Sequence, residues 1–196
     1  MSIEWEIPND KLYNYLESLQ PIYHNEGRSI IMPSGSGKSY WMKHLQPVKN
    51  AFIDSDPLMI AVGAMPPLNG ENLSGLNWKD NQDEICQRVD KVIIKCKEMG
   101  LWIMGATWWE PTLIDACVIL PAYLNKRYLK GKDDIGEGFG KGYYKNEVVP
   151  YINNILRPMV LKAGVRIFKK IDDCVEYIEK TQRIHTMSIT KAIIGL

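Results

Sequence analysis

The segment Met32 to Ser39, MPSGSGKS, has the residue types and the spacing that phosphate binding needs. Phosphate-binding loops follow the pattern G-x-x-x-x-G-K-[ST], in which backbone N–H groups turn inward around the anion. Gly37, Lys38 and Ser39 are in register with this pattern, while Met32 stands where the first glycine is usual. Lys38 is expected to reach the β- and γ-phosphates of a nucleotide, and the Ser39 hydroxyl to ligate magnesium. The residues expected to contact the nucleotide are Pro33, Ser34, Gly35, Ser36, Gly37, Lys38, Ser39 and Tyr40.

Two carboxylates follow in the segment FIDSD, where Asp54 and Asp56 flank Ser55. They come directly after a short apolar run that is typical of a buried strand, so a parallel sheet would place them beside the phosphate loop. We predict that Asp54 places magnesium together with Ser39, and that Asp56 accepts the proton of an attacking hydroxyl. The alternative for Asp56 is that it only caps the helix expected to start near Pro57.

Short apolar runs alternate with helical patterns along the chain, and this alternation predicts an α/β fold with a parallel sheet and helices on both faces. The strands are expected at 28–32, 51–54, 101–105, 116–120 and 165–168. The helices are expected near 9–20, 39–45, 57–65, 84–99, 122–129, 144–163 and 172–181, with Pro150 and Pro158 as boundaries or kinks. A loop or insertion near 66–83 and a glycine-rich, charged segment over 130–142 interrupt the pattern.

The whole-chain composition restricts the class of protein. The chain has 196 residues, 45% of them hydrophobic, which predicts a single domain over 1–196. A formal net charge of +1 gives no argument for nucleic acid or membrane. The four cysteines form no CxxC pair, and with the three histidines they complete no zinc pattern, so reduced thiols are expected. With no signal peptide and no apolar run near the roughly 20 residues that span a bilayer, we expect a soluble cytoplasmic protein, monomeric or homodimeric.

GSGKS followed by FIDSD resembles the small P-loop kinases, the group of shikimate, gluconate, polynucleotide and nucleotide kinases, some of them virus-encoded. The resemblance implies a three-layer P-loop NTPase fold with a five-stranded parallel sheet and a mobile lid. It also implies ATP- and Mg²⁺-dependent transfer of a γ-phosphoryl group to a hydroxyl, with the nucleotide base near 168–173. Three features depart from the group: Met32 in the loop, the third strand ending as MGATWW without an acid, and an acceptor-side sequence over 66–83 that fits no single member. Motor-type ATPases place a magnesium-holding acid after that third strand, so its absence favours a kinase.

The lid implied by the resemblance lies near 126–143, in a segment rich in lysine and glycine. A mobile cation that arrives with the substrate stabilises the charge on the transferred group. Arg127 is the best single candidate, because its planar fork suits phosphate. The alternative is a solvated surface loop. Arg157, on the next helix, either reaches inward or stays exposed.

Trp108 and Trp109, directly after the third strand, indicate a planar acceptor, since an aromatic face can stack a base. The alternative is that each tryptophan packs in the core. Arg88 is the one arginine between Lys38 and Arg127, which favours a hydroxyl over a nucleoside monophosphate as acceptor. The expected acceptor is a nucleoside, a nucleotide, or a nucleic-acid base or end such as DNA, with a small metabolite next. Two other readings stay open: an ATP-hydrolysing binding or assembly protein without acceptor, and a nucleotide-binding protein without chemistry.

Overall fold

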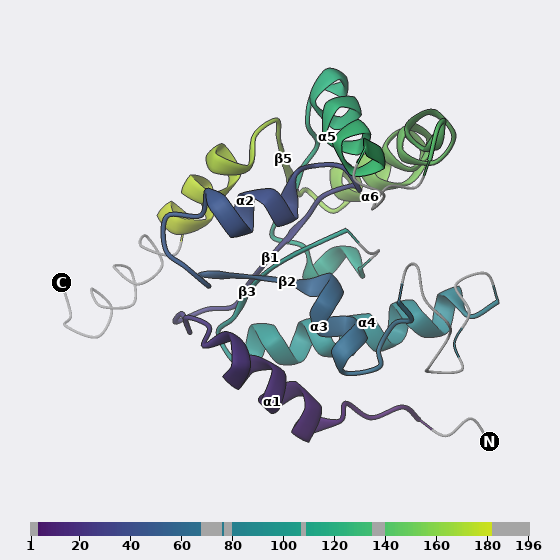
Figure 1. The fold of residues 1–196 in the computed structure, drawn as a ribbon. Helices are drawn as coiled ribbons and strands as arrows, with labels where there is room; N and C mark the ends of the chain where they lie inside the picture. Colours follow the sequence, from purple (N-terminus) through teal and green to yellow (C-terminus); the bar gives the residue numbers. More distant parts are fainter. Residues whose placement is uncertain (1–3, 68–75, 77–79, 107–108, 135–139, 182–196) are drawn as a thin grey trace. The chain divides into compact units, whose positions relative to one another are not determined.

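Five parallel strands form one sheet in the order β2-β3-β1-β4-β5 in the computed structural model (Figure 1). The structure describes residues 4–67, 76, 80–106, 109–134 and 140–181. The strands are β1 (Arg28–Ile31), β2 (Phe52–Asp54), β3 (Trp102–Gly105), β4 (Ala116–Val118) and β5 (Arg166–Phe168). The predicted α/β class and the five-stranded parallel sheet are therefore confirmed, with each strand within two residues of its expected bounds.

The contacts divide the chain into two compact units, and each is described by itself. The first comprises Met1–Met32 and Gly37–Ile114, and the second comprises Pro33–Ser36 and Asp115–Leu196. The boundary crosses the loop motif Met32–Ser39 twice, between Met32 and Pro33 and between Ser36 and Gly37. The single domain expected over 1–196 stays a prediction.

The first unit has helices on both sides of its strands. In Figure 1, α2 (Lys38–His44) lies on one side of β1, β2 and β3, while α1 (Asn9–Leu19), α3 (Ser55–Ala61) and α4 (Gln82–Glu98) lie on the other. Strand β3 pairs in parallel with β1 and β2, and all four of its residues are buried. Because both faces of the strands are covered, they are apolar throughout rather than alternating. A 3-10 turn at Pro111–Leu113 ends the unit.

The second unit joins β4 and β5 through a helical segment. Helix α5 (Ala122–Asp134) follows β4, and η2 (Tyr144–Val148), η3 (Tyr151–Leu156) and α6 (Arg157–Lys162) precede β5. Residues 171–181 form a further helix. As predicted, Pro150 separates η2 from η3 and Pro158 lies in the first turn of α6. The two η segments have π-helical hydrogen bonding, which fits a proline that cannot donate the ordinary helical bond.

Two helix boundaries differ from the sequence prediction. Helix α5 continues to Asp134 rather than ending at 129, so the first part of the expected lid near 126–143 is helical. Its buried residues Asn125 and Leu129 are one helical turn apart, and their packing outweighs the cost of Gly131, about 1 kcal/mol relative to alanine. Helix α3 begins at Ser55 rather than at Pro57. Most of the expected insertion near 66–83 lies outside the described residues.

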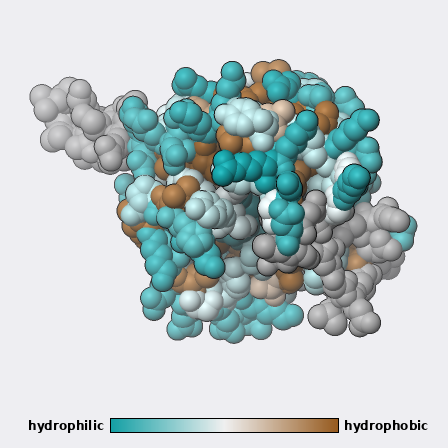
Figure 2. Space-filling view, turned by 45° about the horizontal axis from the view of Figure 1, so that its top comes forward, coloured by the Kyte–Doolittle hydropathy of each residue, from teal (hydrophilic) through white to brown (hydrophobic). Residues whose placement is uncertain are grey.

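The visible face in Figure 2 is largely hydrophilic, with hydrophobic residues scattered over it. None of the helices in the described part of the chain combines the length and the apolar composition needed to cross a membrane.

Candidate functional site

Met32 can replace the first glycine of the loop because it continues the strand. Its backbone N–H donates to the Gly105 oxygen of β3 at 2.9 Å, and its side chain is fully buried. Among the described residues other than glycine, positive φ occurs only at Gln20 and Asn50, so Met32 keeps an ordinary backbone. The left-handed conformations fall instead on Gly35 and Gly37, with φ of 75° and 76°. The glycines therefore stand where the turn requires them.

Helix α5 supports the first half of the loop, within the second unit. The Asn125 side-chain amide donates to the Ser34 oxygen at 3.2 Å, and Leu129 lies against Gly35. A methyl group on Gly35 would come within 2.4 Å of the Leu129 Cγ. Ser36 closes the turn from inside, because its hydroxyl donates to the Pro33 oxygen at 2.6 Å. The backbone of Pro33–Ser36 is thus fixed by contacts within the protein.

Lys38 brings the predicted polar residues together in the first unit. It begins α2 directly after Gly37 and is only 8% exposed. Its Nζ forms ion pairs with Asp54 Oδ1 and with Asp56 Oδ2, the second at 2.7 Å. The Ser39 hydroxyl lies 3.4 Å from Asp54 Oδ2. The ammonium thus lies against both carboxylates and offsets one of their two negative charges, which weakens their mutual repulsion.

Asp54, rather than Asp56, caps helix α3. The Asp54 carboxylate accepts the Asp56 backbone N–H at 3.0 Å, which is the bond expected of an N-cap residue. The capping alternative considered for Asp56 is therefore wrong. The Asp56 carboxylate instead contacts two side chains, Lys38 and the Ser55 hydroxyl, the latter at 3.2 Å.

Ser55 and Gly105 belong to the site, although the sequence reasoning did not select them. Ser55 is fully buried, and a methyl group on Gly105 would lie 2.0 Å from its hydroxyl and 2.4 Å from Trp109 Cζ2. The end of β3 therefore has no room for an acidic side chain, because Ser55 and Trp109 fill that space. The sequence held one signal for this arrangement: the segment MGATWW has no acidic residue at the end of β3, where Gly105 stands.

Tyr15 is a second residue that the sequence did not indicate. It lines a pocket of about 240 Å³ together with Ser39 and Asp54. Burial, and then the negative charge of Asp54, raise the pKa of the Tyr15 phenol. The phenol is therefore a neutral donor close to the carboxylate. Tyr15 comes from α1, far from the motifs in sequence, which is why spacing did not reveal it.

The donor set at Ser39 and Asp54 fits magnesium. Both side chains offer oxygen, the ligand atom that this ion prefers, and two protein ligands suffice because magnesium keeps several waters and phosphate oxygens. No cluster of three or more His, Cys, Asp or Glu residues occurs in the described part of the chain. Ser39 and Asp54 are the residues that would hold the ion if it binds here.

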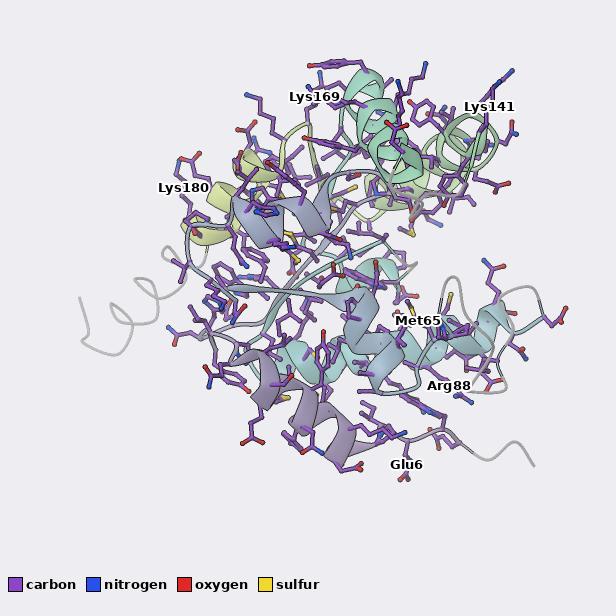
Figure 3. All side chains as sticks on the ribbon, in the orientation of Figure 1. Glu6, Met65, Arg88, Lys141, Lys169 and Lys180 are labelled. Carbon is purple, nitrogen blue, oxygen red and sulfur yellow. The ribbon has the colours of Figure 1, made fainter. Side chains whose placement is uncertain are left out.

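Of the residues predicted for the acceptor, Trp109 is buried in the core and Arg88 is engaged by other residues. Trp109 is 3% exposed, and its indole N–H has no hydrogen-bond partner among the described residues. Arg88, labelled in Figure 3, pairs with Glu84 on its own helix and donates to the Gly63 oxygen. Its guanidinium also lies over the Trp5 ring. Trp108 lies outside the described residues.

Tyr40, which was predicted to contact the nucleotide, is exposed and packs against His44.

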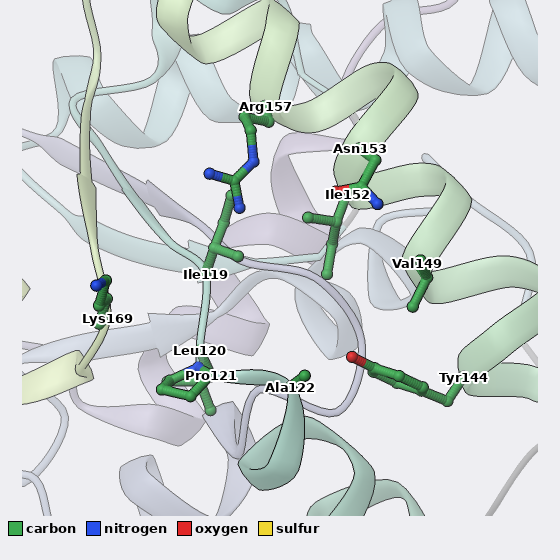
Figure 4. A pocket seen from close by; sticks show the side chains of 10 residues that line it. All are labelled: Ile119, Leu120, Pro121, Ala122, Tyr144, Val149, Ile152, Asn153, Arg157 and Lys169. Carbon is green, nitrogen blue, oxygen red and sulfur yellow. The ribbon is translucent and has the colours of Figure 1, made fainter.

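The predicted lid cation Arg127 is exposed on α5. It is two residues from both Asn125 and Leu129, which puts it about 200° around the helix from the face that supports the loop. Arg157 instead lines a pocket of about 450 Å³ at the ends of β4 and β5, where Lys169 marks the region expected to hold the base (Figure 4).

Comparisons with protein-family models, with curated proteins and with solved structures each found no match.

Proposed function

We propose that the protein is an ATP-dependent kinase that transfers the γ-phosphoryl group to a hydroxyl acceptor. The observation that carries this proposal is the pairing of Lys38 with Asp54 and Asp56, with Ser39 beside Asp54. A loop lysine, a loop hydroxyl and two carboxylates are the groups that phosphoryl transfer needs: a cation for the phosphates, ligands for magnesium and a base.

Lys38 and the loop backbone would hold the donor phosphates. The phosphates would take over the Lys38 ammonium from the carboxylates, since they offer it a denser negative charge. Ser39 and Asp54 would hold magnesium, which neutralises charge on the phosphate oxygens when bound.

Asp56 would act on the acceptor. Once Lys38 turns to the phosphates, Asp56 Oδ2 is free to accept the proton of the acceptor hydroxyl. The hydroxyl oxygen then bonds to the γ-phosphorus, the bond from that phosphorus to the β–γ bridging oxygen breaks, and ADP leaves with the electron pair. In this scheme the ion pairs keep the base occupied until ATP is bound.

The acceptor class of this proposal is a nucleoside, a nucleotide, or a nucleic-acid base or end. The absence of an acid at the end of β3 supports acceptor transfer over ATP hydrolysis, because Gly105 leaves no carboxylate there to activate water. A small-metabolite kinase is the alternative within the same reaction class.

Transfer of label from γ-labelled ATP to a panel of nucleosides, oligonucleotides and polyols tests the proposal. Asp56→Asn is expected to lower the transfer rate by roughly 10²–10⁴-fold, the usual contribution of a general base. The exposed Asp10→Asn is the matched control and should transfer at the wild-type rate. ATP hydrolysis that no acceptor stimulates, or full activity of Asp56→Asn, would contradict the proposal.

A further inference from the structure

A small pocket opens beside the two residues proposed to hold magnesium, within the first unit. It is called the Tyr15 pocket below. It measures about 240 Å³, which is room for several water molecules, since one water takes up about 30 Å³ in the liquid. Five of the residues that line it carry a side-chain oxygen: Tyr15, Ser39, Gln46, Asn50 and Asp54. The pocket is therefore suited to water and to groups that donate hydrogen bonds.

Hydrogen bonds between its walls fix the shape of this pocket. The Asn50 side-chain amide donates to the Leu19 oxygen at the end of α1. Gln46 donates to the Met42 oxygen at 2.8 Å and accepts the Phe52 N–H at 3.3 Å, which joins α2 to β2. Asn50 has a positive φ of 60°, a conformation that asparagine adopts more readily than most residues. The oxygen atoms around the pocket are thus held by the backbone of three elements.

The two oxygens of the Asp54 carboxylate have different neighbours. Oδ1 accepts from the Lys38 ammonium and from the Asp56 N–H. Oδ2 has the Ser39 hydroxyl, at 3.4 Å, as its one hydrogen-bond donor among the described residues. Because a carboxylate oxygen has two lone pairs, Oδ2 keeps capacity for a further donor or for a cation.

The Tyr15 phenol is close to this carboxylate but does not bond to it directly. Burial, and then the charge of Asp54, raise the pKa of the phenol, so it keeps its proton. The hydrogen bonds of the Asp54 side chain in the described part of the chain go to other residues. Polar groups that line one wet space beyond hydrogen-bond distance are joined through water. The phenol suits this task because it both donates and accepts.

Water ligands of a magnesium ion at Ser39 and Asp54 would have room in this pocket. Magnesium gives up water reluctantly and keeps several water ligands when it binds to proteins. Those waters donate hydrogen bonds, and outer groups that receive such bonds orient the ligands and strengthen metal binding. The Tyr15 pocket offers both the volume and the oxygen atoms.

The alternative occupant is an anionic group of a substrate, paired with Lys43, which also lines the pocket. Lys43 is exposed, so solvent screens its charge. The Asp54 side chain is only 20% exposed and would repel an anion in the same small space. Water around a cation is therefore the favoured occupant.

We propose that Tyr15 is a positioning residue of the magnesium site, and that its phenol holds the Asp54 carboxylate and the water ligands of the ion through the Tyr15 pocket. The presence of the ion rests on the proposed function.

Calorimetric titration with a non-hydrolysable ATP analogue, performed once with Mg²⁺ and once with excess chelator, tests this role. The ratio of the two affinities is the gain due to the ion. Tyr15→Phe should reduce this gain by roughly tenfold and leave the metal-free affinity unchanged, since losing an outer group of a metal site costs about 10–100-fold in metal affinity. A merely structural role of Tyr15 would lower both affinities together.

The matched control is Tyr13→Phe, which removes the same hydroxyl from an exposed position on the same helix. It should change neither affinity. Asp54→Asn, alone and combined with Tyr15→Phe, completes a double-mutant cycle. Once Asp54→Asn is present, Tyr15→Phe should cause little further loss, because the two residues act on the same ion.

Lys43→Gln separates the two occupants. The proposal expects it to leave the metal-free affinity unchanged and not to reduce the gain from Mg²⁺. A lower metal-free affinity in this variant would mean that the pocket receives a phosphate group, and would overturn the proposal.

An undiminished gain in Tyr15→Phe, an equal loss in Tyr13→Phe, or full additivity in the cycle would also overturn the role of Tyr15. If the wild type still transfers label to an acceptor, the kinase proposal survives these results. Loss of the gain in Tyr15→Phe, with no transfer to any acceptor by the wild type, supports the role of Tyr15 and contradicts the kinase proposal alone. A wild-type protein that binds no ATP analogue contradicts both.

Discussion

Asp56 occupies a position in which several neighbours fix its carboxylate. One oxygen meets Lys38 and the other receives the Ser55 hydroxyl, and Ser55 is itself held in the space above Gly105. Lys38 would leave when phosphate binds, whereas Ser55 is fully buried and would stay. Ser55 is therefore the residue that would orient the proposed base during transfer.

Ser55→Ala should lower kcat by roughly tenfold to a hundredfold and leave the KM for ATP unchanged, since one hydrogen bond to a charged group contributes about 1.5–3 kcal/mol. Ser55→Thr should restore part of the rate, because it returns the hydroxyl. Gly105→Ala should affect the same step and also destabilise the fold by about 1–3 kcal/mol through overpacking. Steady-state kinetics and urea unfolding measure both effects. An unchanged kcat in Ser55→Ala would show that the serine does not orient Asp56.

At this scale the sequence identified the residues with recognisable motifs and missed those that support them. Lys38, Ser39, Asp54 and Asp56 follow from spacing alone, because the loop and the strand after it are adjacent in a parallel sheet. Ser55 lies between the two carboxylates, but its burial against Gly105 could not be read from the segment, and Tyr15 carries no motif at all. The burial of Trp109 also depends on packing, since a tryptophan after a strand is equally compatible with the core and with a stacking surface.

Helix α5 and the first half of the loop, Pro33–Ser36, form one structural element in the second unit. Leu129 and Asn125 hold the loop backbone from one face of the helix, and Arg127 lies on another. A change in the loop conformation on nucleotide binding would therefore be felt by the helix.

Gly35→Ala should weaken ATP binding and destabilise the protein by about 2–4 kcal/mol, because it combines a left-handed backbone with a collision against Leu129. Adding Leu129→Ala should relieve the collision but not the backbone cost, so the double variant should recover part of the ATP affinity. Calorimetric titration with an ATP analogue measures the recovery. If the double variant is as weak as the sum of the two single variants, Leu129 does not restrain the loop.

The elements themselves were predictable because apolar periodicity is a local property. The end of α5 was misplaced because glycines and charges over 130–142 are typical of a loop, while the anchoring of Leu129 against Gly35 is a tertiary contact. The start of α3 was placed at Pro57 rather than at Ser55 for a similar reason: Asp54 and Asp56 are both suitable caps, and only the backbone at Ser55 decides between them.

For the whole molecule, the pH dependence of stability should reflect Asp90. Burial raises the pKa of this carboxyl, the hydrogen bond from the Glu110 N–H opposes the shift, and the charge of Glu110 adds to it. A raised folded pKa means that the folded state binds more protons, so the stability from Asp90 is full below its unfolded pKa and falls as pH rises through the folded value.

Asp90→Asn keeps an oxygen for Glu110 and removes the charge, so it should be more stable than wild type at pH 7. The difference should shrink as pH falls through the folded pKa of Asp90 and vanish below about 4, where the unfolded carboxyl is also protonated. Urea unfolding at several pH values measures it, with the exposed Glu17→Gln as control. A gain that does not depend on pH would exclude titration of Asp90 as its cause.

The position of β2 at the end of the sheet has a consequence for the behaviour of the protein in solution. An edge strand normally offers unpaired amides that another chain can join, which leads to aggregation. Here the strand has only three residues, and the Phe52 N–H donates to the Gln46 side chain at 3.3 Å. The Asp54 carboxylate at its end adds charge that discourages pairing. The same short strand that ends in Asp54 thus also makes this edge of the sheet a poor template for pairing with another chain.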